Sequence, residues 1–338
     1  MTAAELATAL LLAFLPVFAA DAPSLAVRGE RLTVNGDPRF LVFISYADGI
    51  RRIPDSLDST TVLDADFDYF VRKKIAGVRV FPNWHFRSET LMQCDGTLRP
   101  LQRDKLVKFA ARAAAKNLIV DATFTIDTVR DETGRQCLSA GGYNRGLQLA
   151  TDALRPYRNA LFDLQNEHDK NLPPPDDAHR NGWTAAEWAG YLAQTMAPAI
   201  RTRDASRLLT VSWTSDAPVT AVRDEARIAN WDLVAYHNRG TNWVSNTSER
   251  VTALRKLSAA AGAARPIYLQ EPNRFPFDTN ASHYEAALRN AVRAGAAAWT
   301  FHNSIVERSK PLNGTVAFET LLEPGERTFV DRIAAALP

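Results

Sequence analysis

Two glutamates each close a short apolar run of the chain. Glu167 ends the run that begins at Asn159, and Glu271 ends the run that begins at Pro266. Runs of this length and composition are typical of buried strands. Parallel strands of a barrel share one direction, so carboxylates at their carboxyl ends open onto the same face. Cleavage of a glycosidic bond requires at least two carboxyl groups that face the same cleft.

Glycoside cleavage sets different demands on the two carboxyl groups. The glycosidic oxygen is a poor leaving group and needs a proton, whereas the developing oxocarbenium ion needs a negative charge or a nucleophile. One carboxyl must therefore hold a proton and the other must be ionised. Asn166 lies next to Glu167 and could hydrogen-bond a sugar hydroxyl; a helix-capping pair is the alternative for this Asn-Glu dipeptide.

A rhythm of short apolar runs and amphipathic stretches predicts the scaffold of these glutamates. About eight strand–helix units over ~300 residues favour a (β/α)8 TIM barrel over an open doubly wound sheet, since no Gly-rich turn follows the first strand. Thr184 and Glu187 predict a capping box, and Gly262 and Gly295 stand where helices should end. The predicted strands are residues 40–45, 77–81, 118–124, 160–165, 208–213, 233–237, 267–270 and 296–301, and the clearest helices are 64–75, 101–116, 184–201, 248–261 and 282–294.

The first part of the chain differs from the rest. Leu6 to Ala20 is almost wholly apolar, and small residues follow, which predicts a signal peptide over residues 1–22 and a single barrel domain over residues 23–338. A membrane anchor or a buried N-terminal helix is the alternative, but Pro16 interrupts a run that is short for a span. Residues 25–40 alternate around Asn35-Gly36, which predicts a short β-hairpin cap on the closed end of the barrel.

Composition excludes several classes of protein. The 338 residues carry 40 basic and 38 acidic side chains, a net charge of +2, which gives no support for a nucleic-acid binder. No later segment is as long as a membrane span, so we expect a secreted or periplasmic monomer that is free of the membrane after removal of the leader. The two cysteines, Cys94 and Cys137, fall in loops after neighbouring predicted strands; a disulfide and two free thiols both remain open.

The chain resembles the clan A glycoside hydrolases, and within them most closely the cellulase family, family 5. The resemblance spans nearly the whole mature chain and implies that Glu167 is the acid/base and Glu271 the nucleophile of a retaining enzyme with no metal or organic cofactor. The motifs that carry it are Gly77–Phe81, Leu164–Glu167, Ala235–His237, Leu269–Glu271 and Ala298–Thr300.

Three further residues of these motifs suit a carboxylate site. Arg79 is a fixed cation that could keep Glu271 ionised, with a structural salt bridge as the alternative. His237 could hydrogen-bond either carboxylate or a sugar hydroxyl, with a satisfied core histidine as the alternative. Trp299 offers a flat face for the sugar, with barrel packing as the alternative. Because the acid must hold its proton beside an anion, we expect Glu167 to have the higher pKa of the pair.

The chain also departs from the family pattern. The segment Val120–Asp127, at the third strand, lacks the histidine that is common there, and Arg239 stands where the family usually has a tyrosine that hydrogen-bonds the nucleophile. Tyr236 precedes His237 but should point the other way on a strand. Its aromatic ring and those at other strand ends complete the predicted substrate-binding set: Tyr236, Trp84, Trp213 and Trp243.

Three functions are compatible with these residues. The first is a secreted retaining hydrolase that cleaves β-glycosidic bonds in a β-glycan or oligosaccharide by double displacement. The second is a carbohydrate-binding barrel without turnover, and the third is a transglycosylase that uses the same two glutamates. In each, the partner is a carbohydrate.

Overall fold

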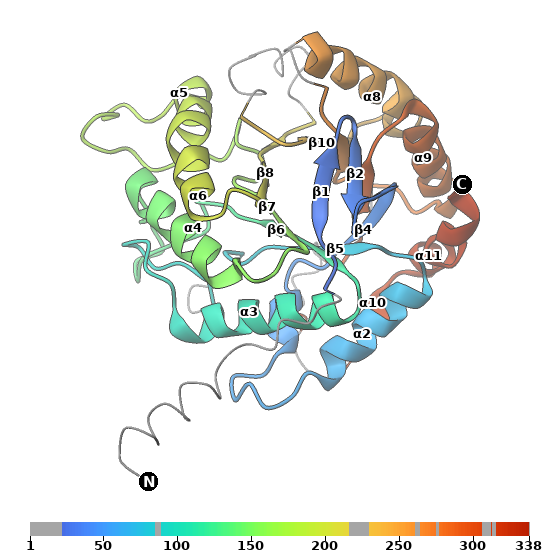
Figure 1. Cartoon of the computed structure of the whole chain (residues 1–338), viewed down its shortest axis with the longest axis horizontal. Helices are drawn as coiled ribbons and strands as arrows, with labels where there is room; N and C mark the ends of the chain where they lie inside the picture. The colour runs from blue at the N-terminus through green and yellow to red at the C-terminus, as the bar shows by residue number, and fades with distance from the viewer. Residues whose placement is uncertain are drawn as a thin grey trace.

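Parallel strands run around a closed barrel in the computed structural model (Figure 1), which describes residues 22–84, 89–215, 230–260, 264–274, 277–305, 312 and 316–337. The strand order is β8-β7-β6-β5-β4-β12-β11-β10-β9. β8 pairs with β7, and β9, which follows in the same run, pairs with β10, so these two short strands close the barrel. The strands are β4 (Leu41–Ser45), β5 (Gly77–Val80), β6 (Ile119–Thr123), β7 (Ala160–Asp163), β8 (Leu208–Thr210), β9 (Ser212–Trp213), β10 (Val234–His237), β11 (Ile267–Gln270) and β12 (Ala298–Phe301).

The helices surround the barrel, as Figure 1 shows, and the predicted (β/α)8 fold is confirmed. The predicted helix over residues 184–201 begins with the expected capping box of Thr184 and Glu187 but contains a π-helical turn. Gly295 ends its helix with a φ of 84°, as predicted. Gly262 lies outside the described residues. The helices are η1 (Gly49–Arg52), α2 (Thr61–Arg72), α3 (Pro100–Ala115), α4 (Ala140–Leu154), α5 (Ala185–Tyr191), η2 (Leu192–Met196), α6 (Ala197–Arg203), α8 (Trp243–Ala260), α9 (Ala281–Ala294), α10 (Phe318–Leu321) and α11 (Pro324–Ala336).

The N-terminal cap has one strand more than the predicted hairpin. β1 (Leu25–Arg28), β2 (Arg31–Val34) and β3 (Asp37–Arg39) form a three-stranded antiparallel sheet. Asn35-Gly36 does form a turn, but it joins β2 to β3, while Gly29, with a φ of 61°, lies in the turn between β1 and β2. The prediction missed the first turn because a single positive-φ glycine is a weaker signal than Asn-Gly.

The interior of the barrel changes from apolar to polar along its axis. Apolar residues of the cap cluster with inward-facing residues at the start of the strands, among them Phe43 and Leu161. Further along the same strands the inward positions carry Arg79, Asp121 and Asp163, all fully buried. The residues between these positions, such as Val78 and Phe162, belong to the core shared with the helices. Successive strand residues face opposite sides, so parity decides which side chains reach the mouth of the barrel.

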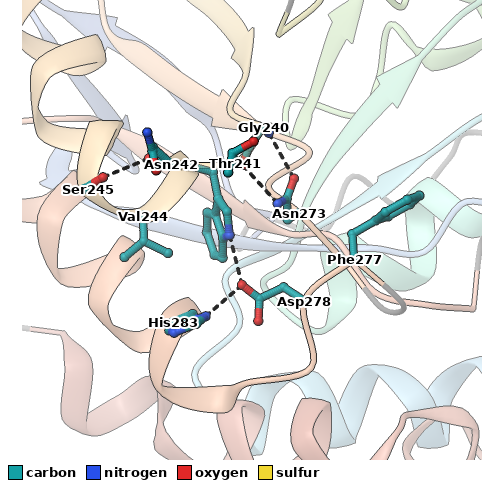
Figure 2. Close-up of a pocket in the computed structure, with 10 residues that line it drawn as sticks. Gly240, Thr241, Asn242, Val244, Ser245, Asn273, Phe277, Asp278 and His283 are labelled. Carbon is teal, nitrogen blue, oxygen red and sulfur yellow. Dashed lines mark hydrogen bonds and ion pairs between the residues drawn. The ribbon is translucent and has the colours of Figure 1, made fainter.

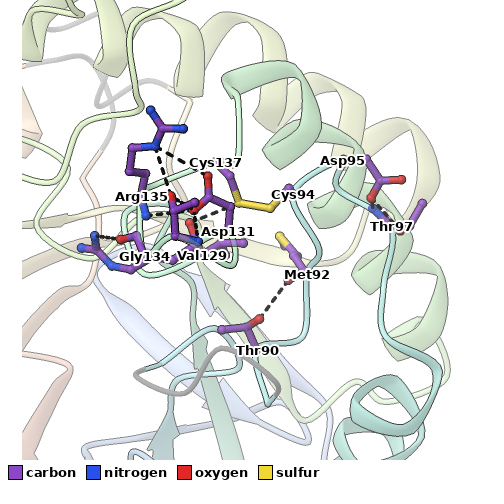
Figure 3. Close-up of a disulfide and its surroundings, with 12 residues drawn as sticks. Thr90, Met92, Cys94, Asp95, Thr97, Val129, Asp131, Gly134, Arg135 and Cys137 are labelled. Carbon is purple, nitrogen blue, oxygen red and sulfur yellow. Dashed lines mark hydrogen bonds and ion pairs between the residues drawn. A yellow bond between two sulfur atoms is a disulfide. The ribbon is translucent and has the colours of Figure 1, made fainter.

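A disulfide joins two loops at this mouth (Figure 3). Cys94 follows β5 and Cys137 follows β6, and their Cα atoms lie 5.1 Å apart with the sulfurs bonded. Of the two alternatives open from the sequence, the structure contains the bonded pair. The bond closes a loop of chain between positions 43 residues apart.

Residues 1–21, which contain the N-terminal apolar run of the predicted signal peptide, lie outside the described residues. Within the described chain, none of the helices combines the length and the apolar character that a membrane crossing requires.

The disulfide should stabilise the fold by constraining the unfolded chain. Replacing both cysteines (Cys94→Ala with Cys137→Ala) should lower the free energy of unfolding by about 2–4 kcal/mol, measured by denaturant titration. The double variant is its own control, since a reducing agent should destabilise the wild type and leave the variant unchanged. A wild type whose stability does not respond to full reduction would contradict this account.

Candidate functional site

The two glutamates meet at the mouth of the barrel. Glu167 follows β7 and Glu271 follows β11, and side-chain oxygens of both lie within 4.8 Å of one another and of a nitrogen of His237. Glu271 is almost fully buried, and Glu167 is more open, with 13% of its side chain exposed. The structure thus brings together the pair that the strand ends predicted.

Both glutamates adopt a backbone conformation that is unusual for residues other than glycine. Glu167 has a φ of 47° and Glu271 a φ of 43°. Left-handed residues with a Cβ cost roughly 1–2 kcal/mol and persist where surrounding contacts fix them. At Glu167 these contacts include the backbone N–H, which donates to the Ser212 hydroxyl at 3.1 Å, and the carbonyl, which accepts from Lys170 and Asn171. The turn directs each carboxylate across the mouth rather than along its strand.

Arg79 on β5 anchors this pair from below. Its Nη1 donates to Glu271 Oε1 at 2.6 Å, and its Nη2 donates to Asn166 Oδ1 at 2.8 Å. Its Nε donates to the Thr123 hydroxyl at 3.0 Å. One guanidinium therefore positions the carboxylate after β11 and the amide after β7 at the same time.

The charges around Arg79 and Glu271 favour their ionised forms. Burial opposes the charge on Arg79, but Glu271, Asp121 and Asp163 outweigh it and raise the pKa of Arg79. Burial also opposes the charge on Glu271, but the positive groups around it, His237 and Arg79 foremost, hold its pKa well below the ordinary value. These neighbours therefore favour the ionised form of Glu271.

Arg239 lies between the two carboxylates. It follows β10, and its Nη2 contacts Glu167 Oε1 and lies 3.1 Å from Glu271 Oε2. His237 Nδ1 lies 2.9 Å from Glu167 Oε1 and 3.4 Å from Glu271 Oε2. Arg239, noted from the sequence only as a departure from the family pattern, is thus a direct neighbour of both acids.

These contacts lower the pKa of Glu167. Burial would raise it and Glu271 raises it further, but the hydrogen bond and charge of His237, together with Arg239, bring the pKa below the ordinary value. The pKa of each glutamate is thus lowered by the cations around it, and the expectation that Glu167 has the higher pKa of the pair stays a prediction. The pKa of Glu167 is not, however, raised toward neutrality, which a general acid needs when it reacts.

His302 belongs to this site and was missed in the sequence. It follows β12, its Nδ1 lies 2.7 Å from the Ser45 hydroxyl, and its Nε2 lies 3.9 Å from Glu271 Oε2. Burial lowers the pKa of His302 well below its ordinary value, so the ring is neutral. The available signal was its position two residues after Thr300, an inward-facing residue of the last strand, because alternate residues of a strand face the same side.

Two aspartates lie beneath the site. Asp121 accepts hydrogen bonds from Tyr268, Gln270 and Thr123, and lies 3.5 Å from Arg79. Asp163 lies 3.6 Å from the same guanidinium. Burial, with a smaller contribution from Asp121, raises the pKa of Asp163 to about 8 against the opposing charge of Arg79.

Three predicted sugar-contacting aromatics are wrong. Trp299, Tyr236 and Trp213 are at most 2% exposed and belong to the core between barrel and helices. Trp299, for example, packs edge-on against Phe329 of α11. Each lies at an outward-facing position of its strand, next to an inward-facing one, so none can contact a substrate in the mouth.

The remaining predicted residues differ in accessibility. Trp84 is half-buried after β5, with its ring centroid 4.7 Å from that of Phe81, and stays a candidate for sugar contact. Asn166 is 4% exposed and held by Arg79. Trp243 is 2% exposed, and its Nε1 donates to Asp278 Oδ2 at 3.0 Å.

A cavity of about 710 Å³ is lined by residues that follow β10 and β11, beginning with Gly240, the residue after Arg239 in the chain (Figure 2). Trp243 and Asp278 form part of its wall, and the ring of Phe277, 70% exposed, projects at one side. In the cavity wall, the Gly240 N–H donates to Asn273 Oδ1, and Asn273 Nδ2 donates to the Gly240 carbonyl. Each hydrogen bond is 3.1 Å long. An exposed aromatic ring beside polar groups is a suitable surface for a sugar.

Glu167, His237 and Glu271 also have donor atoms close enough together to hold a metal ion. The two carboxylates already share the Arg239 guanidinium, so a metal ion would have to displace it. The Arg239 guanidinium therefore occupies the place between the carboxylates that a metal ion would take.

Comparisons with known proteins extend the description of the fold. Neither a protein-family model nor a curated protein sequence matches the chain. Among solved structures, a β-mannanase from Thermomonospora fusca in complex with mannotriose has a TM-score of 0.60 at 14% identity, over 94% of this chain and 98% of that one. A β-mannanase from the blue mussel Mytilus edulis has a TM-score of 0.57 at 16% identity, over 91% and 96%. A glycoside hydrolase family 5 enzyme from Prevotella bryantii, in complex with a xyloglucan tetradecasaccharide, has a TM-score of 0.59 at 13% identity, over 88% and 96%. At these identities the comparison establishes the shared barrel fold.

The buried Asp163 should lower the free energy of unfolding as the pH rises. The folded protein keeps this proton up to about pH 8, whereas the unfolded chain loses it near pH 4, so the contribution of Asp163 to stability falls between these values. Asp163→Asn should therefore raise the melting temperature at pH 7.5 by about 2–4 °C and by less at pH 5. Differential scanning calorimetry at both pH values measures the effect. A variant that is less stable than the wild type at pH 7.5 would mean that Asp163 is an ionised partner of Arg79.

Proposed function

We propose that the protein is a retaining β-glycoside hydrolase like those of family 5, with Glu271 as the nucleophile and Glu167 as the acid/base. The observation that carries the proposal is the approach of the two carboxylates to within 4.8 Å at the mouth of the barrel. Retaining enzymes hold their carboxyl groups about 5–5.5 Å apart, whereas inverting enzymes separate them by about 6.5–9.5 Å to admit a water molecule. The mannanase and xyloglucan-bound neighbours add support at the level of the fold.

The reaction would proceed in two displacements. Glu271 attacks the anomeric carbon while Glu167 gives its proton to the departing glycosidic oxygen, which leaves a glycosyl ester on Glu271 and an anionic Glu167. Glu167 then takes a proton from water as the water attacks the same carbon. The bond to Glu271 breaks, and both carboxyl groups return to their starting states.

The surrounding residues have separate tasks in this scheme. Arg79 keeps Glu271 ionised and fixes its orientation through the 2.6 Å hydrogen bond. The same guanidinium holds the oxygen of the Asn166 amide at 2.8 Å, which leaves the amide nitrogen for a sugar hydroxyl. Neutral His302 borders the nucleophile without adding a charge.

Arg239 favours one alternative, a carbohydrate-binding barrel without turnover. It contacts both glutamates, and it lowers the pKa of the group that must act as an acid. Hydrolysis requires that this guanidinium leave Glu167 when a substrate binds. A protein in which Arg239 never leaves would bind sugars and cleave none.

The proposed substrate is a β-glycan or oligosaccharide, and the proposed location is the periplasm or the exterior of the cell. The apolar run Leu6–Ala20 supports export, and so does the Cys94–Cys137 disulfide, because such bonds persist in oxidising compartments. We propose that the exported chain works as a monomer without a cofactor.

A fluorinated mechanism-based aryl glycoside should label Glu271. The fluorine slows both steps, a good leaving group restores the first, and the ester accumulates. Peptide mapping by mass spectrometry should locate one sugar on Glu271. A label on any other carboxylate would refute the assignment of the nucleophile.

Glu167→Gln and Glu271→Gln should separate the two roles. Glu271→Gln should lose at least about 10³-fold in kcat on every aryl β-glycoside that the wild type cleaves. In kcat/KM, which reports the first displacement, Glu167→Gln should lose about 10²–10⁴-fold on substrates with poor leaving groups but much less on 2,4-dinitrophenyl glycosides, whose leaving group needs no proton. Glu187→Gln, in the exposed capping box of α5, is a matched control and should retain full activity. Equal activity of all three variants would refute hydrolysis by these residues.

The pH optimum of kcat/KM should lie on the acid side of neutrality. The rate falls when Glu271 gains a proton at low pH and when Glu167 loses its proton at higher pH. The surrounding cations lower the pKa of both carboxyl groups from the ordinary range of a glutamate, so the pair should give an optimum on the acid side, below about pH 5. Arg239→Gln should move the alkaline limb upward by about one pH unit, because a cation leaves the neighbourhood of Glu167. An alkaline limb above pH 7 in the wild type would contradict the described contacts.

A further inference from the structure

Arg239 has a fixed backbone and a displaceable side chain. The Arg239 carbonyl accepts a hydrogen bond from Arg250 Nη1 at 3.0 Å, and the next residue, Gly240, is tied to Asn273 by two hydrogen bonds. The side chain is 29% exposed. Its Nε atom is buried and has no hydrogen-bond partner among the described residues. This donor is therefore available to an acceptor on a bound ligand.

Three guanidinium groups lie around the two glutamates. Arg274 lies close enough to Glu271, Arg239 and Glu167 for their charges to influence its pKa. Arg79 holds Glu271 at 2.6 Å, whereas Arg239 contacts Glu167 and lies 3.1 Å from Glu271. Glu167 is thus the nearest counter-ion of Arg239.

Catalysis disturbs this pairing. For the first displacement Glu167 must carry a proton, so it no longer offers Arg239 a negative charge. The loss falls on Arg239, because Glu167 is its nearest counter-ion and Arg79 already holds Glu271. A neutral sugar cannot supply the missing negative charge, and a partly buried guanidinium without a counter-ion is costly.

We propose that Arg239 recognises a carboxylate on the substrate, so that the preferred substrate is a β-glycoside of a uronic acid. This inference rests on the proposed function and names its substrate class. The planar guanidinium can hold a carboxylate through two parallel hydrogen bonds, one of them from the Nε atom that now lacks a partner. In forming them, Arg239 turns from Glu167 toward the sugar.

The exchange explains how binding prepares the acid. The substrate carboxylate replaces Glu167 as the partner of Arg239, and Glu167, relieved of that contact, takes up a proton from solvent and can then give it to the glycosidic oxygen. The cavity that Gly240 lines, next to Arg239 in the chain, offers room for a neighbouring sugar unit. Its acidic residue, Asp278, already has partners in Trp243 and His283, so it does not compete for Arg239.

The test compares pairs of 4-nitrophenyl β-glycosides that differ only at C6: glucoside and glucuronide, galactoside and galacturonide, mannoside and mannuronide. The wild type should cleave at least one uronide about 100-fold more efficiently, as kcat/KM, than its neutral partner. Arg239→Gln should lower the ratio of kcat/KM for that uronide to kcat/KM for its neutral partner by about 100-fold, while Arg239→Lys, which keeps the charge but not the planar pair of donors, should lower this ratio by less. Arg135→Gln, on an exposed loop at the same end of the barrel, controls for loss of a positive charge.

A direct binding measurement accompanies the kinetics. In isothermal titration, sodium salts of the three uronic acids are added to the wild type and to both Arg239 variants, whose folding is checked by their melting temperatures. Binding of the matching uronate by the wild type and its loss in Arg239→Gln support the inference. The inference is overturned if neutral sugars are preferred in every pair, or if Arg239→Gln changes both members of a pair equally.

The outcomes separate the two proposals. If neutral glycosides are cleaved in a manner that depends on Glu167 and Glu271 while no uronide is preferred, the substrate class is wrong and the hydrolase stands. If the wild type cleaves no glycoside and no mechanism-based label attaches, the hydrolase itself is wrong, and the inference falls with it.

Discussion

The ion pair between Arg79 and Glu271 is the contact on which the rest of the site depends. It joins two strands on opposite parts of the barrel, β5 and β11, across an interior from which water is largely excluded. A buried charge is tolerated only with partners, and removal of one partner from such a pair costs about 3–5 kcal/mol. The buried charge of Arg79 has such partners, because its three nitrogens donate hydrogen bonds to Glu271, Asn166 and Thr123. The nucleophile is therefore placed by the same group that keeps it ionised.

A second constraint comes from the pleat of the strands. Inward positions at the start of the barrel are apolar and rest on the N-terminal cap, and inward positions near the mouth are polar. Beside the ring of Phe81, which lies 4.7 Å from the guanidinium carbon of Arg79, this gradient places Asp121 and Asp163 where they can share its charge. The left-handed turns at Glu167 and Glu271 then place both carboxylates above this layer, where a substrate can reach them.

The parts of this arrangement that follow from local pattern could be predicted from the sequence. The strand runs were found to within two residues, because strands buried on both faces are continuous apolar runs. The proximity of Glu167 and Glu271 followed from their positions at strand ends. Strand parity applied consistently would also have excluded Trp213 and Trp299, since each alternates with a residue that faces the barrel, and it would have favoured His302.

Other parts depend on contacts that no short segment of sequence encodes. The helices α4 and α11 were not among the clearest predicted stretches, although both bury one face against their neighbours. The third strand of the cap and the π-helical turn after α5 are further examples. The contact of Arg239 with both glutamates depends on how two loops pack at the mouth, and the sequence indicated only that an arginine replaced the expected tyrosine.

Attack by Glu271, with Glu167 acting from the opposite side, is the central claim, and the configuration of the first product tests it most directly. Proton NMR can follow the anomeric signals during the first minutes of hydrolysis of an aryl β-glycoside, before mutarotation mixes them. Carboxylates that lie within 4.8 Å of each other predict that the β-anomer appears first and the α-anomer grows in later. Initial release of the α-anomer would show that water, and not Glu271, attacks the sugar, and would contradict the account.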